Sequence, residues 1–102
     1  MRQTRIIWDT KAKEELRTII IYIKDKSLQG AANVRDDIFN AVNKLSIPNI
    51  SYPADPVLGL PYRFILARNR YRIIYRKTKG TRRILRIFDV RQSPHKLCIK
   101  TE

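Results

Sequence analysis

The C-terminal part of the chain concentrates side chains that can bind a phosphodiester and cleave it. Arg72 carries a guanidinium whose fork of donors suits bidentate phosphate binding, and Arg91 lies further along the same basic stretch. His95 is the only histidine, and a neutral imidazole can take a proton from a hydroxyl. Metal-free RNA cleavage needs such a base, cations that stabilise the charge growing on the phosphate, and a proton donor for the leaving oxygen. The C-terminal half therefore offers candidates for these roles, among them Arg72, Arg91 and His95.

Five further residues are candidates for binding nucleic acid. Gln92 can hydrogen-bond a base edge or simply close a turn, and the others offer cations to phosphates; the set is Arg63, Arg70, Arg86, Gln92 and Lys96. Structural roles stay open beside these: Arg72 as a surface arginine, Arg91 in an ion pair with Asp89, and His95 as an exposed residue of the tail.

The charge of the chain is distributed unevenly. Residues 1–61 carry nine basic and seven acidic side chains, a net of +2. Residues 62–102 carry thirteen basic side chains against Asp89 and Glu102, which leaves a net of +11 in 41 residues. Solvated surfaces usually mix the two signs, so this asymmetry favours a polyanionic partner.

Length and composition exclude several classes of protein. A chain of 102 residues is the size of one domain, and we expect a single domain over residues 1–102. One cysteine, Cys98, allows no internal disulfide, and neither a zinc-binding pattern nor a phosphate-binding glycine loop is present, so we expect no metal and no cofactor. The longest apolar run, residues 19–23, is far shorter than a membrane span. We expect a cytoplasmic protein.

The elements that position these residues change in character along the chain. Residues 4–8 are β-branched and aromatic and predict a strand, after which Asp9 or Thr10 can cap a helix. Two amphipathic helices follow, joined near residues 24–27, with Ser27 as the N-cap of the second and an end before Pro48. The short joint predicts an antiparallel hairpin. Four of the five prolines then fall in residues 46–61 and predict a loop.

From Tyr62 the hydrophobic period becomes two, which predicts three consecutive antiparallel strands over residues 62–66, 70–76 and 82–91. In the middle strand Tyr71, Ile73 and Tyr75 share one face, which we expect to pack under the helices. The opposite face carries arginines beside Ile74, and we expect it to stay open. The last strand is apolar on both faces and should be central. The whole is an α+β fold, with an N-terminal strand and a helix hairpin packed on an antiparallel sheet that the C-terminal meander completes.

This order of elements, and several segments of the sequence, resemble the RelE/ParE toxin superfamily of type II toxin–antitoxin systems. The resemblance covers nearly the whole chain. It is carried by Tyr62-Arg63, by residues 69–75 (NRYRIIY), and by residues 86–97 (RIFDVRQSPHKL), which are similar to the common ending of these toxins.

The resemblance implies one of two activities. RelE-like members are ribosome-dependent mRNA endonucleases that block translation, cut without metal and use the 2′-hydroxyl as nucleophile. In that case Arg72 and Arg91 would face the phosphate, and His95 lies where several members keep a catalytic His or Tyr; another position where some keep a tyrosine is Leu97 here. ParE-like members inhibit DNA gyrase and have no nuclease activity. The nuclease is the leading hypothesis and the gyrase inhibitor the alternative. Either kind implies a cognate antitoxin, a small acidic protein, as partner.

Overall fold

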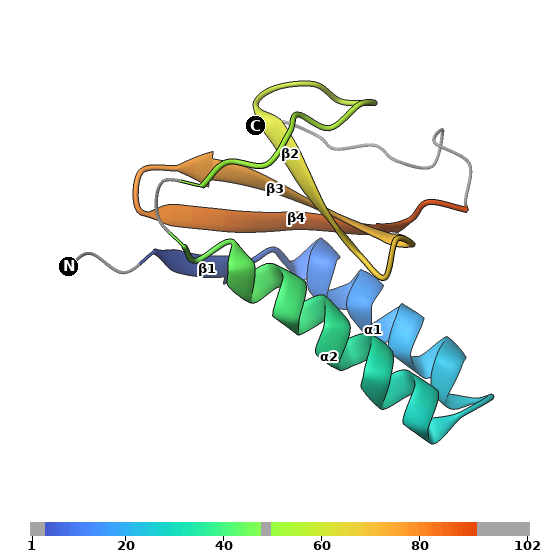
Figure 1. Cartoon of the computed structure of the whole chain (residues 1–102). Coiled ribbons are helices and arrows are strands. Elements are labelled where there is room, and N and C mark those ends of the chain that lie inside the picture. Colours follow the sequence, from blue (N-terminus) through green and yellow to red (C-terminus); the bar gives the residue numbers. More distant parts are fainter. Residues whose placement is uncertain (1–3, 48–49, 92–102) are drawn as a thin grey trace.

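The computed structural model describes residues 4–47 and 50–91. Two helices lie on one side of a four-stranded sheet (Figure 1). The elements, in chain order, are β1 (Arg5–Trp8), α1 (Thr10–Lys24), α2 (Leu28–Lys44), β2 (Tyr62–Ala67), β3 (Tyr71–Thr78) and β4 (Thr81–Asp89). Each corresponds to a predicted element, with ends shifted by one or two residues.

The helix hairpin forms where the sequence predicts it. The Ser27 hydroxyl accepts a hydrogen bond from the Gly30 N–H at 2.9 Å and so caps α2 as expected. Asp9 occupies the cap position of α1, but its side chain makes no cap hydrogen bond. Its carboxylate instead pairs with Arg83 of β4 at 2.7 Å. Asp9 therefore links the start of α1 to the sheet through an ion pair.

The strands lie in the order β1-β4-β3-β2. The meander β2–β3–β4 is antiparallel, and β4 is central, both as predicted. β1 runs parallel to β4, with Arg5 opposite Thr81 and Trp8 opposite Ile84, so the sheet is mixed rather than wholly antiparallel. A long crossover joins β1 to the meander, and such a connection permits a parallel pairing that a tight turn would forbid.

The main core lies between the sheet and the helices. Tyr71, Ile73 and Tyr75 are at most 2% exposed and pack against the apolar faces of α1 and α2, which confirms the prediction for this face of β3. From α2 the buried residues include Val34, Ile38 and Val42. Their spacing of four residues places them on one helical face.

Part of the opposite face of the sheet is covered, so the expectation of an open arginine face is wrong at Arg72, although Arg76 is exposed. Ile74, Tyr62 and Phe88 form a second buried cluster, against which Leu58 packs from the proline-rich loop. The loop is held on the sheet by two backbone hydrogen bonds, from Phe64 to the Pro53 carbonyl and from Asp55 to that of Tyr62. The loop packs on this face because Ile74 and Phe88 present apolar surface there, and covering that surface removes it from water.

Candidate functional site

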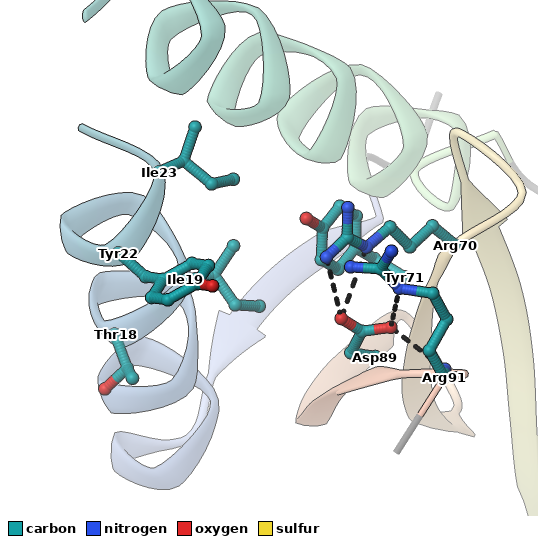
Figure 2. A pocket seen from close by; sticks show the side chains of 8 residues that line it. All are labelled: Thr18, Ile19, Tyr22, Ile23, Arg70, Tyr71, Asp89 and Arg91. Carbon is teal, nitrogen blue, oxygen red and sulfur yellow. Dashed lines mark hydrogen bonds and ion pairs between the residues drawn. The ribbon is translucent and has the colours of Figure 1, made fainter. Parts of the chain in front are cut away.

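A groove opens between α1 and the ends of β3 and β4, with a volume of about 590 Å³. Thr18, Ile19, Tyr22 and Ile23 of α1 form one wall, and Arg70, Tyr71, Asp89 and Arg91 form the other (Figure 2). We call it the Asp89 groove. It combines a long apolar wall with cations and is the candidate site in the described part of the chain.

Asp89 organises the charged wall of the groove. One carboxylate oxygen accepts hydrogen bonds from the Arg70 side chain at 3.1 and 3.2 Å. The other accepts from the Arg91 backbone N–H at 2.9 Å and lies 3.6 Å from the Arg91 Nε. Because the Arg91 side chain is 65% exposed and that of Arg70 only 34%, Arg91 offers the more accessible cation. The Arg91–Asp89 ion pair, which the sequence left open as an alternative, is therefore present.

Tyr71 contributes a phenol to the same wall. Its ring is buried, and the Arg70 guanidinium lies over it at 5.2 Å from the ring centroid. Burial raises the pKa of Tyr71 above its usual 10.0, with the Asp89 carboxylate adding to the rise, while Arg70 and Arg68 oppose it. The phenol therefore keeps its proton at neutral pH and can donate a hydrogen bond or a proton, but it is a poor base.

Arg72 does not line this groove and lies on the loop-covered face of β3. Its side chain is 17% exposed and packs over the Phe64 ring, 5.5 Å from the centroid. Its Nε faces the fully buried Asp55 carboxylate at 3.7 Å, too long for a hydrogen bond. Arg72 and Arg91 are thus on different faces, and the prediction that both meet one phosphate is not supported by the geometry.

Arg86 is a structural residue, in contrast to its predicted role in nucleic-acid binding. A β-bulge interrupts the β3–β4 register between Ile74 and Tyr75. Near this bulge Arg86 reaches α1, where its guanidinium donates to both Glu15 carboxylate oxygens at 2.6–2.9 Å. Its side chain is 11% exposed. The donors that a phosphate would need are already bound to a carboxylate.

The other predicted residues have separate outcomes. Arg63 donates to the Tyr52 carbonyl at 2.8 Å and so holds the start of the proline-rich loop against β2. Arg70 does line the Asp89 groove. The predicted Gln92, His95 and Lys96 lie outside the described residues.

Part of the positive charge of the second half of the chain is paired with acids of the first half. Four arginines of the second half pair with acids of the first half: Arg68 with Asp37, Arg72 with Asp55, Arg83 with Asp9, and Arg86 with Glu15. Counting charged side chains separately in residues 1–61 and 62–102 therefore overstated the number of unpaired cations on the sheet. Sequence alone cannot show this, because each pair joins residues that are distant along the chain.

Two of these acids were missed by the sequence analysis although each left a signal. Glu15 falls between Ala12 and Ile19, on the sheet-facing side of α1, where an acid needs a partner. Asp55 stands between two prolines of the loop, and its Oδ2 accepts from the Val57 and Leu58 N–H groups at 3.0 and 2.9 Å. Acids in such positions are typical of residues that fix a turn.

Two negative findings apply to the ranges 4–47 and 50–91. They contain no cluster of His, Cys, Asp and Glu side chains suited to a metal ion. Neither helix there is long and apolar enough to cross a membrane.

Comparisons with known proteins identify the class of this fold. One solved structure, described as "Chromosomal ParDE TA system from P. aeruginosa", superposes with a TM-score of 0.70 at 20% sequence identity, covering 84% of this chain and 95% of that one. The likeness shows that the two proteins share this fold. The family described as "ParE toxin of type II toxin-antitoxin system, parDE" matches residues 6–94. The chain therefore belongs to the ParE toxin family. A search of curated proteins gives no match.

Proposed function

We propose that the chain arrests growth by binding DNA gyrase and does not cleave RNA. The observation that carries the proposal is the position of Arg72: its guanidinium is packed over Phe64 and faces buried Asp55 beneath the loop. A nuclease of the RelE kind needs this arginine at the phosphate, whereas an inhibitor that works by binding does not. Membership of the ParE family supports the same choice.

The proposal includes a partner and a compartment. The solved relative is described as a ParDE system, so we propose that a small acidic antitoxin neutralises this chain. A net charge of +13 favours an acidic partner. Gyrase acts on DNA in the bacterial cytoplasm, where we place the toxin.

An RNA endonuclease is the second candidate, and the Asp89 groove is the observation that favours it. It brings together an exposed Arg91 guanidinium and the Tyr71 phenol, which burial keeps protonated. A cation beside a proton donor can stabilise a phosphorane and protonate its leaving oxygen. The described part of the groove supplies no base for the 2′-hydroxyl, since Asp89 is engaged by two arginines.

The test uses variants that leave the fold intact. Arg91→Ala removes an exposed cation and Tyr71→Phe removes only a hydroxyl, while Arg17→Ala removes an exposed arginine outside the groove as the control. Each protein is induced in bacteria, with growth and mRNA 5′ ends recorded, and is then added to purified gyrase in a supercoiling assay.

The two candidates give different results. We expect wild type to inhibit supercoiling and to leave messages intact, with Arg91→Ala and Tyr71→Phe losing at most a small part of the toxicity. Messages cut at translated codons by wild type, but not by Arg91→Ala or Tyr71→Phe, would contradict the proposal and establish the nuclease. In that event wild type should leave gyrase fully active.

A further inference from the structure

One row of side chains crosses the face of the sheet that looks away from the helices (Figure 1). Tyr62 of β2 pairs with Arg76 of β3, Arg76 with Arg83 of β4, and Arg83 with Ile7 of β1. Paired residues of neighbouring strands point to the same face. Tyr62 belongs to the loop-covered cluster, so the whole row lies on that face. Arg76 and Arg83 in the middle of the row are exposed, so the loop covers only one end of it.

Three arginines from three adjacent strands meet on this uncovered part of the sheet. Arg76 and Arg83 are directly opposite each other. Arg5 precedes Ile7 by two residues on β1, so its side chain points to the same face. Arg5 and Arg76 are exposed, and the Arg83 side chain is 53% exposed. We call these three residues the arginine cluster.

Most of the charge of the arginine cluster is unpaired. Within residues 4–47 and 50–91, the side chains of Arg5 and Arg76 make no hydrogen bond or ion pair. Arg83 donates from its Nε to the Asp9 carboxylate at 2.7 Å, which leaves the two terminal nitrogens of its guanidinium for another acceptor. The remaining arginines of the strands, Arg63, Arg72, Arg82 and Arg86, contact acids or backbone carbonyls instead.

The position of Arg76 is unfavourable for folding alone. Like charges directly opposite each other in a sheet destabilise it, and the Cα atoms of such a pair are only about 5 Å apart. Asp9 reduces the charge at Arg83, but no acid of the described chain does so at Arg76. An anion that contacts both guanidinium groups would remove the repulsion and add charge-assisted hydrogen bonds.

We propose that the arginine cluster binds the phosphate backbone of duplex DNA. The strands β1, β4 and β3 are neighbours in the sheet, and two strand spacings place the cluster across about 10 Å. One strand of a DNA duplex carries a phosphate per roughly 3.4 Å of helix axis, so this width matches about three phosphates. The guanidinium fork suits bidentate phosphate binding.

The surroundings of the cluster favour a duplex over other polyanions. Single-stranded nucleic acid binds largely by stacking its bases on aromatic side chains. The aromatic residues of this face are Tyr62, Phe64 and Phe88, and they pack in the loop-covered cluster. An acidic amphipathic helix or a membrane needs exposed apolar surface, whereas Ile7 beside Arg83 is only partly exposed. A duplex presents its phosphates outward and needs only cations.

The inference goes beyond the proposed function. None of the three arginines lines the Asp89 groove, whose other wall is α1 on the opposite side of the sheet. DNA binding is measured without gyrase. It can therefore fail while gyrase inhibition holds, and the reverse result is equally distinct.

The test measures the affinity of the whole chain for labelled nucleic acid by fluorescence anisotropy. The main probe is a DNA duplex of roughly 20 base pairs, titrated at several NaCl concentrations from about 0.05 M upward. A single-stranded RNA of the same length and a poly-glutamate competitor represent the other classes of partner.

Two double variants separate the cluster from net charge. Arg5→Gln with Arg76→Gln removes the unpaired cations of the cluster, and Arg17→Gln with Arg35→Gln removes two arginines of α1 and α2. Each double variant lowers the net charge by two, from +13 to +11. All four positions are exposed, so both proteins should fold, which circular dichroism checks.

We expect wild type to bind the duplex with a Kd on the order of 1 μM at low salt and to bind the single strand more weakly. The cluster variant should bind the duplex about tenfold or more weakly. Its slope of log K against log salt should be smaller by about 2, because two phosphate contacts are lost. The helix variant should lose less than about threefold in affinity. Arg76→Gln alone should weaken binding about threefold, which gives a second measurement at a single exposed site.

Three results would overturn the proposal. The first is a failure of wild type to bind the duplex at low salt. The second is an equal loss of affinity in the cluster and helix variants, which would mean that net charge alone attracts DNA. The third is tighter binding of single-stranded RNA or poly-glutamate than of the duplex, which would assign this face to a different class of partner.

Discussion

At the scale of single residues, Glu15 joins the helical half of the chain to the sheet. Its carboxylate accepts three hydrogen bonds of 2.6–2.9 Å from Arg86 and a fourth, at 2.9 Å, from the Ile87 N–H. β1 pairs with β4 only as far as Ile84, so Glu15 covers part of the edge of β4 beyond β1. A buried edge N–H would otherwise lack a partner.

Glu15→Ala should therefore destabilise the protein by about 2 kcal/mol, because it removes the hydrogen bonds from Arg86 to this carboxylate and takes the acceptor away from the Ile87 N–H at the strand edge. The side chains are 19% and 11% exposed, which keeps the loss below that of a fully buried pair. Urea unfolding measures the effect. Glu14→Ala, at an exposed neighbouring position, is the control and should cost less than about 0.5 kcal/mol. Equal costs for the two would show that the Glu15 contacts add nothing.

Tyr71 gives a prediction in alkali. Because burial raises its pKa above 10.0, the folded protein holds a proton that the unfolded chain releases. The stabilisation from this difference is complete at pH values below the pKa of Tyr71 in the unfolded chain. It is lost as the pH rises through the pKa of Tyr71 in the folded protein. Tyr71→Phe should remove a component above pH 10.0 from the tyrosinate absorbance titration. Loss of a component at or below pH 10.0 would contradict the assignment.

At the scale of elements, the proline-rich loop is the part that decides which arginines are available. Asp55 binds two N–H groups of the loop and also faces Arg72, so one carboxylate fixes both the loop and the covered face of β3. The loop thereby removes from solvent a surface that the strand pattern alone would leave to a ligand.

Asp55→Ala should cost about 3 kcal/mol, because it leaves Arg72 charged beneath the loop without a carboxylate. Asp55→Asn should cost about half as much, since the amide oxygen still accepts from Val57 and Leu58. Urea unfolding gives both values, and limited proteolysis should cut the loop first in Asp55→Ala. Asp36→Ala and Asp36→Asn are matched exposed controls. Similar costs for the Asp36 and Asp55 variants would argue against this role.

At the scale of the whole molecule, the ion pairs leave the net charge of the chain unchanged. The chain carries +13, which disfavours the compact state through self-repulsion. The pairs between the halves offset part of this at close range, where salt screens little. The remaining repulsion acts over longer distances, where salt screens well.

Raising NaCl from about 0.05 M to about 0.5 M should therefore raise the Tm by a few degrees. A double variant, Arg76→Glu with Lys79→Glu at two exposed positions, lowers the net charge by four, from +13 to +9, and its Tm should rise less. Differential scanning calorimetry measures both. A Tm that falls with salt would mean that the exposed ion pairs outweigh the repulsion.

The sequence by itself determined the elements and the main core. Periods of 3.6 and two residues identified both helices and the meander, and Ser27 identified the start of α2. The face of β3 that carries Tyr71, Ile73 and Tyr75 was predictable as well. These features depend on residues close together along the chain, whose pattern a reader can follow without coordinates.

Only the tertiary structure decided which charged residues are available. Nothing in the sequence distinguishes Arg72 and Arg86 from Arg91. In the fold, however, Arg72 faces Asp55 and Arg86 pairs with Glu15, acids 17 and 71 positions away in the chain. The Arg91 side chain stays exposed. The parallel direction of β1 and the Asp89 groove likewise come from elements meeting in space. The physical reason is that an ion pair, a crossover or a groove depends on distance in the folded chain, which a local pattern does not encode.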